Sequence, residues 1–388
     1  LINPVYSQRN NFYNYRILDE KYHKSKEYPS QIAWSLEKKY LEDIDTWTNI
    51  NLANSIDLDG SAGPITSLET FNDLLIAFQE KSLSQILFNS RVQIPTSEGV
   101  PIEISNNYKV EGVRTISDTV GCQDKATIAK SLYGLYFIDS TTDTLYLYNG
   151  QLQDISTKAG FNFWMKKYHT DDLWNMESGS TGIRASYDPN RRRLYLSSLK
   201  DTSNENTLCY SEQLEAVESL MSYSNVVMFP MDNNFFSLTK ICQLWQNYEG
   251  EYNKFYGEYK MPWFTYICND NPFVTKVFDT IEYQADVDII DTKKSAYVWQ
   301  YNKSFDWIRA YNEYQDSDKK ILTQLRKISG NISLRNKFRM WRGQIPRQGR
   351  ERIRNPWAAI TLGFNDPDDK NPSDFKLRLH NISTKYTI

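Results

Sequence analysis

Two hairpin patterns about 50 residues apart place the strongest constraint on the fold of this chain. Residues 133–139 and 145–150 are rich in Tyr, Leu, Phe and Ile, and the polar stretch 140–143 separates them. Residues 183–197 repeat the arrangement around an Asp-Pro-Asn corner. Because aromatic and aliphatic runs on both sides of turn-forming residues are typical of paired strands, both segments predict antiparallel hairpins.

The spacing of the two hairpins favours a β-propeller. Each propeller blade is a small antiparallel sheet, and blades recur at roughly 40–50 residues. A β-sandwich contains similar hairpins and stays the alternative. In the first hairpin, the alternation predicts that Leu135, Phe137, Leu145 and Leu147 share one face and that Tyr136, Tyr146 and Tyr148 share the other. Residues 213–222 have the apolar spacing of a short helix.

Length and composition favour a mainly β protein with three parts. The 388 residues include 27 Tyr, 18 Phe and 10 Trp, an aromatic content that favours strands. We predict an N-terminal arm over 1–62 that belongs to a longer chain, with a short helix or extended segment at 31–44. A β-propeller-like domain follows over 63–272. Residues 273–388, where the strand patterns lengthen, predict a C-terminal antiparallel β, sandwich-like domain.

Composition also argues against several classes of function. No apolar run approaches 18 residues, so we expect no membrane span. Cys122, Cys209, Cys242 and Cys268 lie far apart and predict reduced core residues rather than a zinc site. The three histidines have no partner at metal-ligand spacing, and the acidic turn at 57–60 lacks the remaining ligands of a calcium loop. We therefore expect no cofactor, no metal and no enzymatic activity.

Residues 335–354, called here the arginine strip, form the strongest local charge signal. Seven arginines and Lys337 face only Glu351 in this stretch. Two interpretations stay open: contact with the phosphates of DNA, or pairing with carboxylates in this chain or in a neighbouring subunit. The second is favoured, because arginine forms forked pairs with carboxylates and tolerates partial burial. The candidate interface residues are Arg339, Trp341, Arg342, Arg352, Arg354 and Trp357.

Many short motifs resemble the tail muzzle, or tail stabilisation, proteins of crAss-like phages. They include Asp57-Leu-Asp-Gly60, Ile86-Leu-Phe-Asn-Ser-Arg91, Gly99-Val-Pro-Ile-Glu-Ile104, Asn312-Glu-Tyr-Gln315, Lys337-Phe-Arg-Met-Trp-Arg342 and Arg352-Ile-Arg-Asn-Pro-Trp357. The likeness covers residues 46–388. It implies a non-enzymatic virion protein at the phage tail, related to the nozzles of short-tailed phages, that forms a homo-oligomeric ring.

The resemblance also implies partners. They are other tail and portal-side ring proteins, and phage DNA that passes transiently through the tail channel without tight binding. In this role the ring closes the channel and takes part in genome retention and ejection.

Two other functions stay open from the residues themselves. One is a carbohydrate-binding propeller for host attachment, with Trp164, Tyr168 and Trp174 as sugar-stacking candidates, although core or interface packing is the favoured role of these aromatics. The other is a glycan hydrolase built on carboxylates such as Asp286 with Asp288, or Asp366 with Asp368 and Asp369. Neither carboxylate group has the arrangement that catalysis needs, and the sequence does not identify a host receptor.

Overall fold

The structure is a computed structural model of the 388-residue chain. It describes residues 28–35, 48, 50, 53–88, 91–94, 102–105, 110–159, 161–168, 182–199, 206–291, 296–324, 330–364 and 375–388. These residues form a mainly β protein, as predicted, in two compact units, residues 1–247 and 248–388. The three-part division expected from the sequence stays a prediction.

The first large sheet of the N-terminal unit is antiparallel and has the strand order β3-β4-β5-β8. Its strands are β3 (Ile65–Phe71), β4 (Leu74–Gln79), β5 (Leu83–Phe88) and β8 (Val110–Ser117). The β3–β4 turn places Asn72 and Asp73 at φ of 47° and 62°, a left-handed conformation that these two residue types tolerate. A separate hairpin of β6 (Arg91–Ile94) and β7 (Ile102–Ser105) lies in the sequence between β5 and β8.

A small two-stranded sheet precedes this one. It pairs β1 (Gln31–Ala33) with β2 (Ser55–Asp57). Of the two alternatives for 31–44, a short helix or an extended segment, residues 31–33 form a strand, and residues 36–44 lie outside the described residues. After β2, the short 3-10 helix η4 (Gly60–Ala62) is capped by Asp59, whose carboxylate accepts hydrogen bonds from the Ser61 backbone N–H at 2.9 Å and the Ser61 hydroxyl at 2.7 Å. The acidic turn thus has a local structural role.

Both predicted hairpins are confirmed as parts of four-stranded sheets. The first sheet contains β9 (Ala129–Lys130), β10 (Leu135–Asp139), β11 (Thr144–Tyr148) and β12 (Leu152–Asp154). The second contains β13 (Ile183–Asp188), β14 (Arg193–Ser198), β15 (Thr207–Ser211) and β16 (Ala216–Met221). A three-stranded sheet follows, with β17 (Val227–Met231), β18 (Asn234–Leu238) and β19 (Leu244–Gln246).

The helix expected at 213–222 is wrong. Along β16 the side chains alternate between exposed and half-buried, which is the period-two pattern of a strand with one face against the core. The apolar residues that suggested helical spacing are instead divided between a turn, with Leu214, and the strand, with Val217 and Leu220.

The predicted faces of the first hairpin are also wrong. In the β10–β11 register, Leu135 lies opposite Tyr148 and Phe137 lies opposite Tyr146. Leu135 and Phe137 therefore share a face with the tyrosines of β11 and not with its leucines. Residues directly opposite in an antiparallel pair share a face. Both faces are buried, because this sheet lies between two others, and a strand covered on both sides carries no single apolar face to read from sequence.

Apolar layers join consecutive sheets of the N-terminal unit. The layer between the sheets containing β4 and β10 includes Phe78, Leu83, Leu135, Phe137 and Tyr148. The layer between the sheets containing β10 and β14 includes Tyr136, Leu145, Leu147, Leu194, Leu196 and Leu208. A third layer joins Tyr195 and Cys209 to Met228 and Phe235 of the three-stranded sheet. Successive sheets therefore pack face to face.

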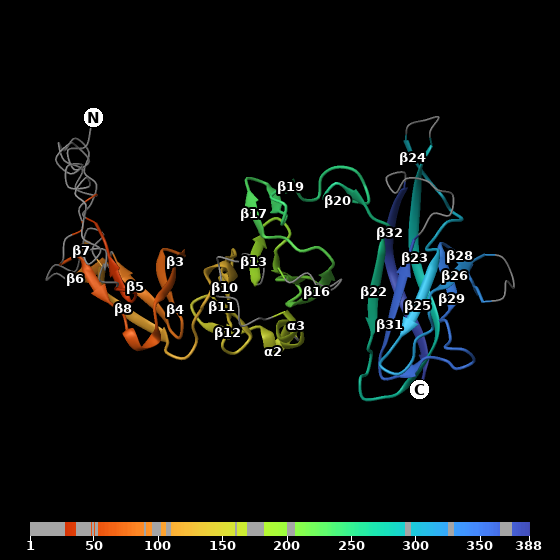
Figure 1. Cartoon of the computed structure of the whole chain (residues 1–388), viewed down its shortest axis with the longest axis horizontal. Coiled ribbons are helices and arrows are strands. Elements are labelled where there is room, and N and C mark those ends of the chain that lie inside the picture. The colour runs from red at the N-terminus through yellow and green to blue at the C-terminus, as the bar shows by residue number, and fades with distance from the viewer. Residues whose placement is uncertain are drawn as a thin grey trace, which may run out of the picture. The chain divides into compact units, whose positions relative to one another are not determined.

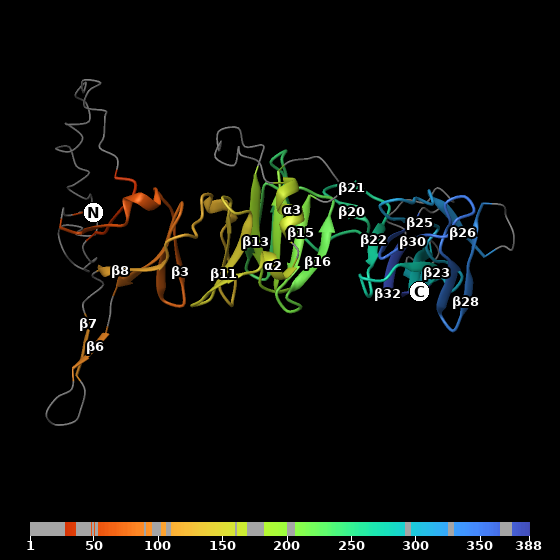
Figure 2. The same ribbon diagram turned by 90° about the horizontal axis from the view of Figure 1, so that it is seen from below.

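Two helices complete the second of these layers. They are α2 (Ser156–Ala159) and α3 (Phe161–Tyr168), and Figure 2 shows them beside the strands of the β13–β16 sheet. The buried side chains of α3 are Phe161, Trp164, Met165 and Tyr168. Their spacing of three, four and seven residues is typical of an amphipathic helix. No helix was predicted here from the sequence.

A carboxylate joins the same two sheets by polar contacts. Glu212 accepts hydrogen bonds from the hydroxyls of Ser131 at 3.0 Å, Tyr136 at 3.0 Å and Tyr187 at 2.5 Å. Burial first, and then the Glu212 carboxylate, raise the pKa of the Tyr136 hydroxyl and of the Tyr187 hydroxyl. Both hydroxyls therefore stay protonated and act as donors.

The C-terminal unit is a pair of sheets that share one core. The first sheet has the order β22 (Trp263–Cys268), β31 (Ala358–Gly363), β25 (Trp307–Tyr311), β26 (Lys320–Thr323) and β27 (Ile332–Ser333). The core includes Ile308, Ile360 and Leu362 from this sheet and Ile281, Tyr283 and Trp341 from the other. Strand β22, which the sequence placed in the propeller-like part, thus belongs to the C-terminal unit.

The second sheet is built around β23 (Lys276–Asp291), a 16-residue strand. One edge of β23 pairs with β32 (Phe375–Thr387) along almost its whole length, as Figure 1 shows. The other edge pairs in turn with β30 (Arg354–Asn355), β29 (Met340–Gln344) and β24 (Ala296–Trp299). Strand β28 (Arg335–Lys337) then pairs with β29, and a small hairpin of β20 (Lys254–Phe255) and β21 (Glu258–Tyr259) precedes β22.

The buried position of Leu147 generates the first prediction. Leu147 is 8% exposed in the layer between two sheets, so Leu147→Asp would bury an unpaired carboxylate at a cost of several kcal/mol. We expect the variant to lose soluble expression or to unfold at a much lower temperature. The matched control is Leu132→Asp, at a leucine that is 65% exposed. Equal thermal unfolding curves for wild type and Leu147→Asp would contradict the observed packing.

Candidate interaction surface

The first part of the arginine strip forms a tight hairpin. Strands β28 and β29 are joined by Phe338 and Arg339, at φ of 53° and 61°. Two successive left-handed residues are the signature of a two-residue type I′ turn, which normally uses Asn and Gly. A phenylalanine and an arginine pay a steric cost there. The turn presents Phe338 to solvent, with 88% of its surface exposed.

Acidic residues of β23 contact basic side chains of the neighbouring strands, an arrangement called here the charge ladder. Glu282 pairs with Lys385 at 2.8 Å and with Arg342 at 3.1 Å. Further along, Asp286 contacts His380 at 2.8 Å and Asp288 pairs with Arg378. Arg342 therefore has a carboxylate partner inside its own chain, which is the favoured interpretation of the strip for this residue. The carboxylates Asp286 and Asp288 both belong to this ladder.

The pKa of Glu282 shows the electrostatic effect of the ladder. The hydrogen bond from Lys385, followed by the charges of Lys385 and Arg342, lowers the pKa of this carboxyl below its ordinary value, although partial burial acts in the opposite direction. The ionised carboxylate is therefore favoured in the folded state.

The end of the strip is held in place by an ion pair and by a side-chain amide. Arg352 donates to Asp279 of β23 at 2.7 Å. Gln315 donates through Nε2 to the backbone oxygen of Arg352 at 3.1 Å and accepts through Oε1 from the backbone N–H of Arg354 at 2.7 Å. The side-chain amide of Gln315 thus bonds to the backbone at and just before β30 in the way that a neighbouring strand would. These two bonds fix the backbone that carries Arg352 and Arg354.

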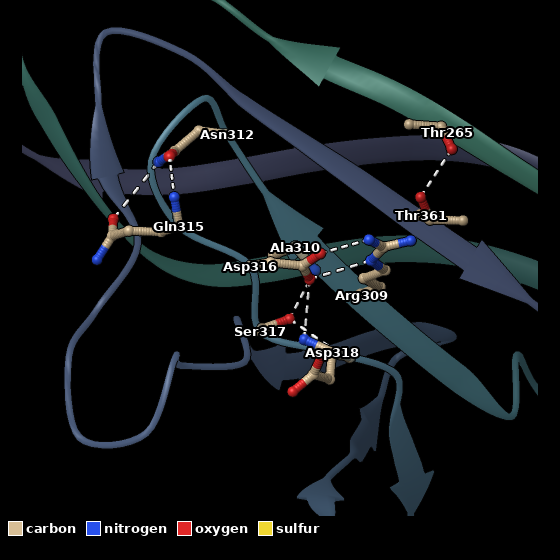
Figure 3. Close-up of polar contacts among 9 residues, drawn as sticks. All are labelled: Thr265, Arg309, Ala310, Asn312, Gln315, Asp316, Ser317, Asp318 and Thr361. Atoms are coloured by element: carbon tan, nitrogen blue, oxygen red, sulfur yellow. Dashed lines mark hydrogen bonds and ion pairs between the residues drawn. The ribbon is translucent and has the colours of Figure 1, made fainter.

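The turn that carries Gln315 is itself ordered by local bonds (Figure 3). The Asn312 carboxamide oxygen accepts from the backbone N–H of Tyr314 at 2.9 Å and of Gln315 at 2.8 Å. Arg309 forms a forked ion pair with Asp316, whose Oδ1 lies 3.0 Å from Arg309 Nε. The hydrogen bond from Arg309 lowers the pKa of Asp316. The motif at 312–315, singled out by resemblance alone, therefore has a positioning role.

The six interface candidates have different environments. Trp341 is 2% exposed and belongs to the core, so its contacts lie within the unit. Trp357 is half-buried. Arg342 and Arg352 pair with carboxylates of β23, as described above. Arg339 places its guanidinium 5.0 Å from the ring centre of Trp299, and Arg354 has an exposed side chain.

The remaining cations of the strip have no carboxylate partner among the described residues. They are exposed and form neither an ion pair nor a side-chain hydrogen bond within the described parts of the chain: Arg335, Lys337, Arg339, Arg347, Arg350 and Arg354. Arg335 even lies directly opposite Arg342 across the hairpin, an unfavourable placement for like charges. This group, called here the unpaired cations, is the part of the strip available to another molecule.

The other residues considered from sequence have different outcomes. Trp164 and Tyr168 are core residues of α3, as favoured, whereas Trp174, Asp366, Asp368 and Asp369 lie outside the described residues. Three cysteines are buried, but Cys242 is exposed, so its expected core position is wrong. Burial raises the pKa of the Cys122 thiol to about 12 and that of Cys209 to about 11, which keeps both protonated at neutral pH.

Among the described residues, no group of three or more His, Cys, Asp and Glu side chains is placed to hold a metal ion. In the same part of the chain no helix combines the length and the apolar character that a membrane crossing needs.

The charge ladder generates the second prediction. Because the folded pKa of Glu282 is lowered, its contribution to stability is complete above its ordinary pKa near 4.5 and is lost as the pH falls through the lower folded value. Near neutral pH, Glu282→Gln should lower the free energy of unfolding by no more than about 1 kcal/mol, since the partners are partly exposed. Denaturant unfolding from neutral to acidic pH checks this.

The difference between wild type and Glu282→Gln should shrink below pH 4.5. Glu313→Gln, at an exposed glutamate, is the control and should show no such pattern. A difference that stays constant across the acidic range would argue against the ladder.

Comparisons with known proteins agree with the resemblance in the motifs. The family described as Crassvirus muzzle protein matches residues 1–240, and the family described as Crassvirus muzzle protein C-terminal domain matches residues 250–348. The muzzle protein of Bacteroides phage crAss001 is 44% identical over 373 residues, which is 95% of this chain and 26% of that protein. The chain thus spans about a quarter of the length of this relative. With these matches the chain belongs to the Crassvirus muzzle protein family.

Proposed function

We propose that this chain is a non-enzymatic structural part of a phage virion, located in the tail of a short-tailed crAss-like phage. In this role it is a subunit of a ring that closes the tail channel and takes part in genome retention and ejection. Membership of the muzzle protein family supports the virion role, since the relative with 44% identity is named a muzzle protein of a Bacteroides phage. The ring would contact other tail and portal-side ring proteins.

The main support for the proposed assembly is the set of unpaired cations. Arginines make forked, charge-assisted bonds with carboxylates, and such bonds are stronger than neutral hydrogen bonds. Within the chain, Glu282 forms an ion pair with Arg342, and Asp279 forms one with Arg352. The remaining cations point to acidic groups of another subunit.

The distribution of charge along the chain supports a second copy as that subunit. Residues 1–247 have 30 acidic residues against 22 lysines and arginines, whereas residues 248–388 have 18 against 23. The N-terminal unit therefore has a net charge of −8 and the C-terminal unit +5, which together give the total of −3. A head-to-tail contact between copies would bring opposite charges together, and a heterologous contact of this kind closes into a ring when its rotation allows.

DNA is the less favoured partner of these cations. Strong contact with phosphates would hold a genome that must pass through the channel, because each cation that neutralises a phosphate adds salt-dependent affinity. We propose that DNA passes transiently and that the cations bind protein carboxylates.

We also propose that the N-terminal unit is a propeller-like body. Face-to-face packing of its antiparallel sheets through the layers around Phe137, Leu194 and Tyr195 is the arrangement of neighbouring propeller blades, and it supports this proposal.

A triple variant tests the assembly. Replacing Arg335, Arg347 and Arg350 with Ser should reduce the oligomeric fraction in mass photometry, because three carboxylate partners in the neighbouring copy lose their cations. The thermal unfolding curve should change little, since these side chains have no partner in the described parts of their own chain. The matched control, Lys125, Lys130 and Lys166 to Ser, removes the same charge from exposed positions of the N-terminal unit.

Titration with duplex DNA at two salt concentrations separates the two partners. The proposal predicts weak DNA binding that the triple variant does not change. A chain that stays monomeric at every concentration, or a triple variant with intact oligomers and a lost, steeply salt-dependent DNA affinity, would contradict it.

A further inference from the structure

A hollow lies where the pairing along one edge of β23 is interrupted. Strand β29 pairs with β23 over Thr280–Tyr283 and β24 pairs over Asp288–Asp291, with one further bond from Gln300 N–H to the Val287 oxygen, so Gln284–Asp286 lies between these partners on this edge. A hollow of about 130 Å³ occupies this gap, with Ala285 and Asp286 of β23 and the indole of Trp341 among its lining. The interrupted sheet therefore forms a small site on rigid strands.

Aromatic residues form one wall of the hollow. Trp299 and Tyr301, at and just after the end of β24, are 43% and 70% exposed, and their ring centres lie 6.4 Å apart. The guanidinium of Arg339 lies 5.0 Å from the ring centre of Trp299. Arg339 has this position because of the strained turn at the tip of the β28–β29 hairpin, and strained backbone is often retained where a side chain has a functional position.

The polar groups of the hollow include both donors and acceptors. Asp286 accepts from Trp299 Nε1 at 3.2 Å and contacts His380 Nε2 at 2.8 Å, one contact for each carboxylate oxygen. Each oxygen has a further lone-pair direction. Asn336 donates to the backbone oxygen of Tyr301 at 3.0 Å, which leaves its Oδ1 without a partner among the described residues, and the Gln300 side chain likewise has none there.

We propose that this hollow binds one sugar ring of a polysaccharide, with preference for a sugar that carries a carboxylate. A sugar hydroxyl both donates and accepts, so it needs carboxylate or amide oxygens as acceptors and N–H groups as donors, and Asp286, Asn336, Gln300 and Arg339 supply them. The exposed side chains of Trp299 and Tyr301 contact the apolar side of the sugar ring. Arg339, which has no carboxylate partner in the described parts of the chain, provides the forked donor for a carboxylate on the sugar.

The size of the hollow limits the ligand. Pockets for drug-sized molecules measure about 300–1,000 Å³. At about 130 Å³ the hollow holds a single ring-sized group, so the longer glycan extends outward. Affinity for one ring is then in the millimolar range, about −4 kcal/mol.

The same chemistry argues against a nucleic acid in the hollow. A strand of DNA presents a phosphate at every nucleotide, whereas the lining of the hollow offers a single guanidinium, Arg339, beside the Asp286 carboxylate. Sites for single-stranded nucleic acid combine aromatic side chains with a groove that is positive throughout. Here Asp286 and Arg339 offset each other, which suits hydroxyl groups better than a phosphate chain.

Binding of methyl glycosides to the purified 388-residue chain tests the inference. The probes are the methyl glycosides of glucose, galactose, mannose and glucuronic acid, followed by saturation-transfer NMR and calorimetry. We expect binding of at least one probe in the millimolar range, with the glucuronide among the binders. Trp299→Ala should weaken binding about tenfold, since loss of an aromatic contact of about 1.4 kcal/mol corresponds to that factor.

Matched variants separate the site from general effects. Trp263→Ala removes a tryptophan of similar exposure, 48%, from a strand that does not line the hollow, and it should leave binding unchanged. Arg339→Gln should reduce affinity for the glucuronide and leave affinity for the neutral glycosides nearly unchanged. Tyr301→Ala, at a residue that is 70% exposed, provides a second removal of the aromatic wall if Trp299→Ala unfolds.

Three results would overturn the inference. One is the absence of binding by all four glycosides up to about 50 mM, well above the millimolar range expected for one ring. Another is an equal loss of binding in Trp263→Ala and Trp299→Ala. The third is binding of a short oligothymidine that depends on Trp299 while no glycoside binds, which would assign the hollow to a nucleic acid.

Discussion

The pairing of β23 on both edges is the interaction on which the C-terminal unit depends. Its 16 residues bond to β32 on one side and to β30, β29 and β24 on the other, so segments between residues 276 and 387 are joined through one strand. Its inward side chains, such as Ile281 and Tyr283, lie in the core shared with the second sheet. Its acidic residues between them form the charge ladder. One strand thus fixes the core, the ion pairs and the hollow.

The arginine strip divides into two groups because of this strand. Arg342 and Arg352 lie within reach of Glu282 and Asp279, so they stabilise the sheet that carries them. The other cations project from a hairpin tip, from a turn or from the far end of β30, where no described carboxylate approaches. Assembly, as proposed, uses the unpaired cations other than Arg339, whereas glycan binding uses Arg339 together with the aromatic and polar groups of the hollow. If copies assemble in a ring, several weak glycan sites act together and the effective affinity rises.

Local patterns in the sequence predicted the positions of the strands better than which residues of paired strands share a face. The hairpins around 140–143 and 188–190 were evident because turn-forming residues separate aromatic runs. The faces of β10 and β11 could not be assigned, since both faces are buried and apolar residues then occur at every position. The turn at Phe338 and Arg339 was missed because neither residue type favours positive φ. The helix α3 did carry a signal, in the spacing of Phe161, Trp164, Met165 and Tyr168.

The candidate site was predictable in composition but not in geometry. Seven arginines within 20 residues are evident in the sequence. The carboxylate partners of Arg342 and Arg352 lie more than 50 residues away, at Glu282 and Asp279, and only the register of β23 brings them close. The hollow likewise depends on the gap between β29 and β24, which arises from the lengths of three strands and not from any motif.

The central claim is that the unpaired cations of one copy meet carboxylates of the N-terminal unit of another. Zero-length coupling of amines to carboxylates, applied to a mixture of ¹⁴N- and ¹⁵N-labelled chains and read by mass spectrometry, tests it most directly. The account predicts mixed-isotope peptides that join Lys337 to acidic residues within 1–247, with fewer of them at high salt. Coupling of Lys337 found only in single-isotope peptides, or only with acids of residues 248–388, would contradict it.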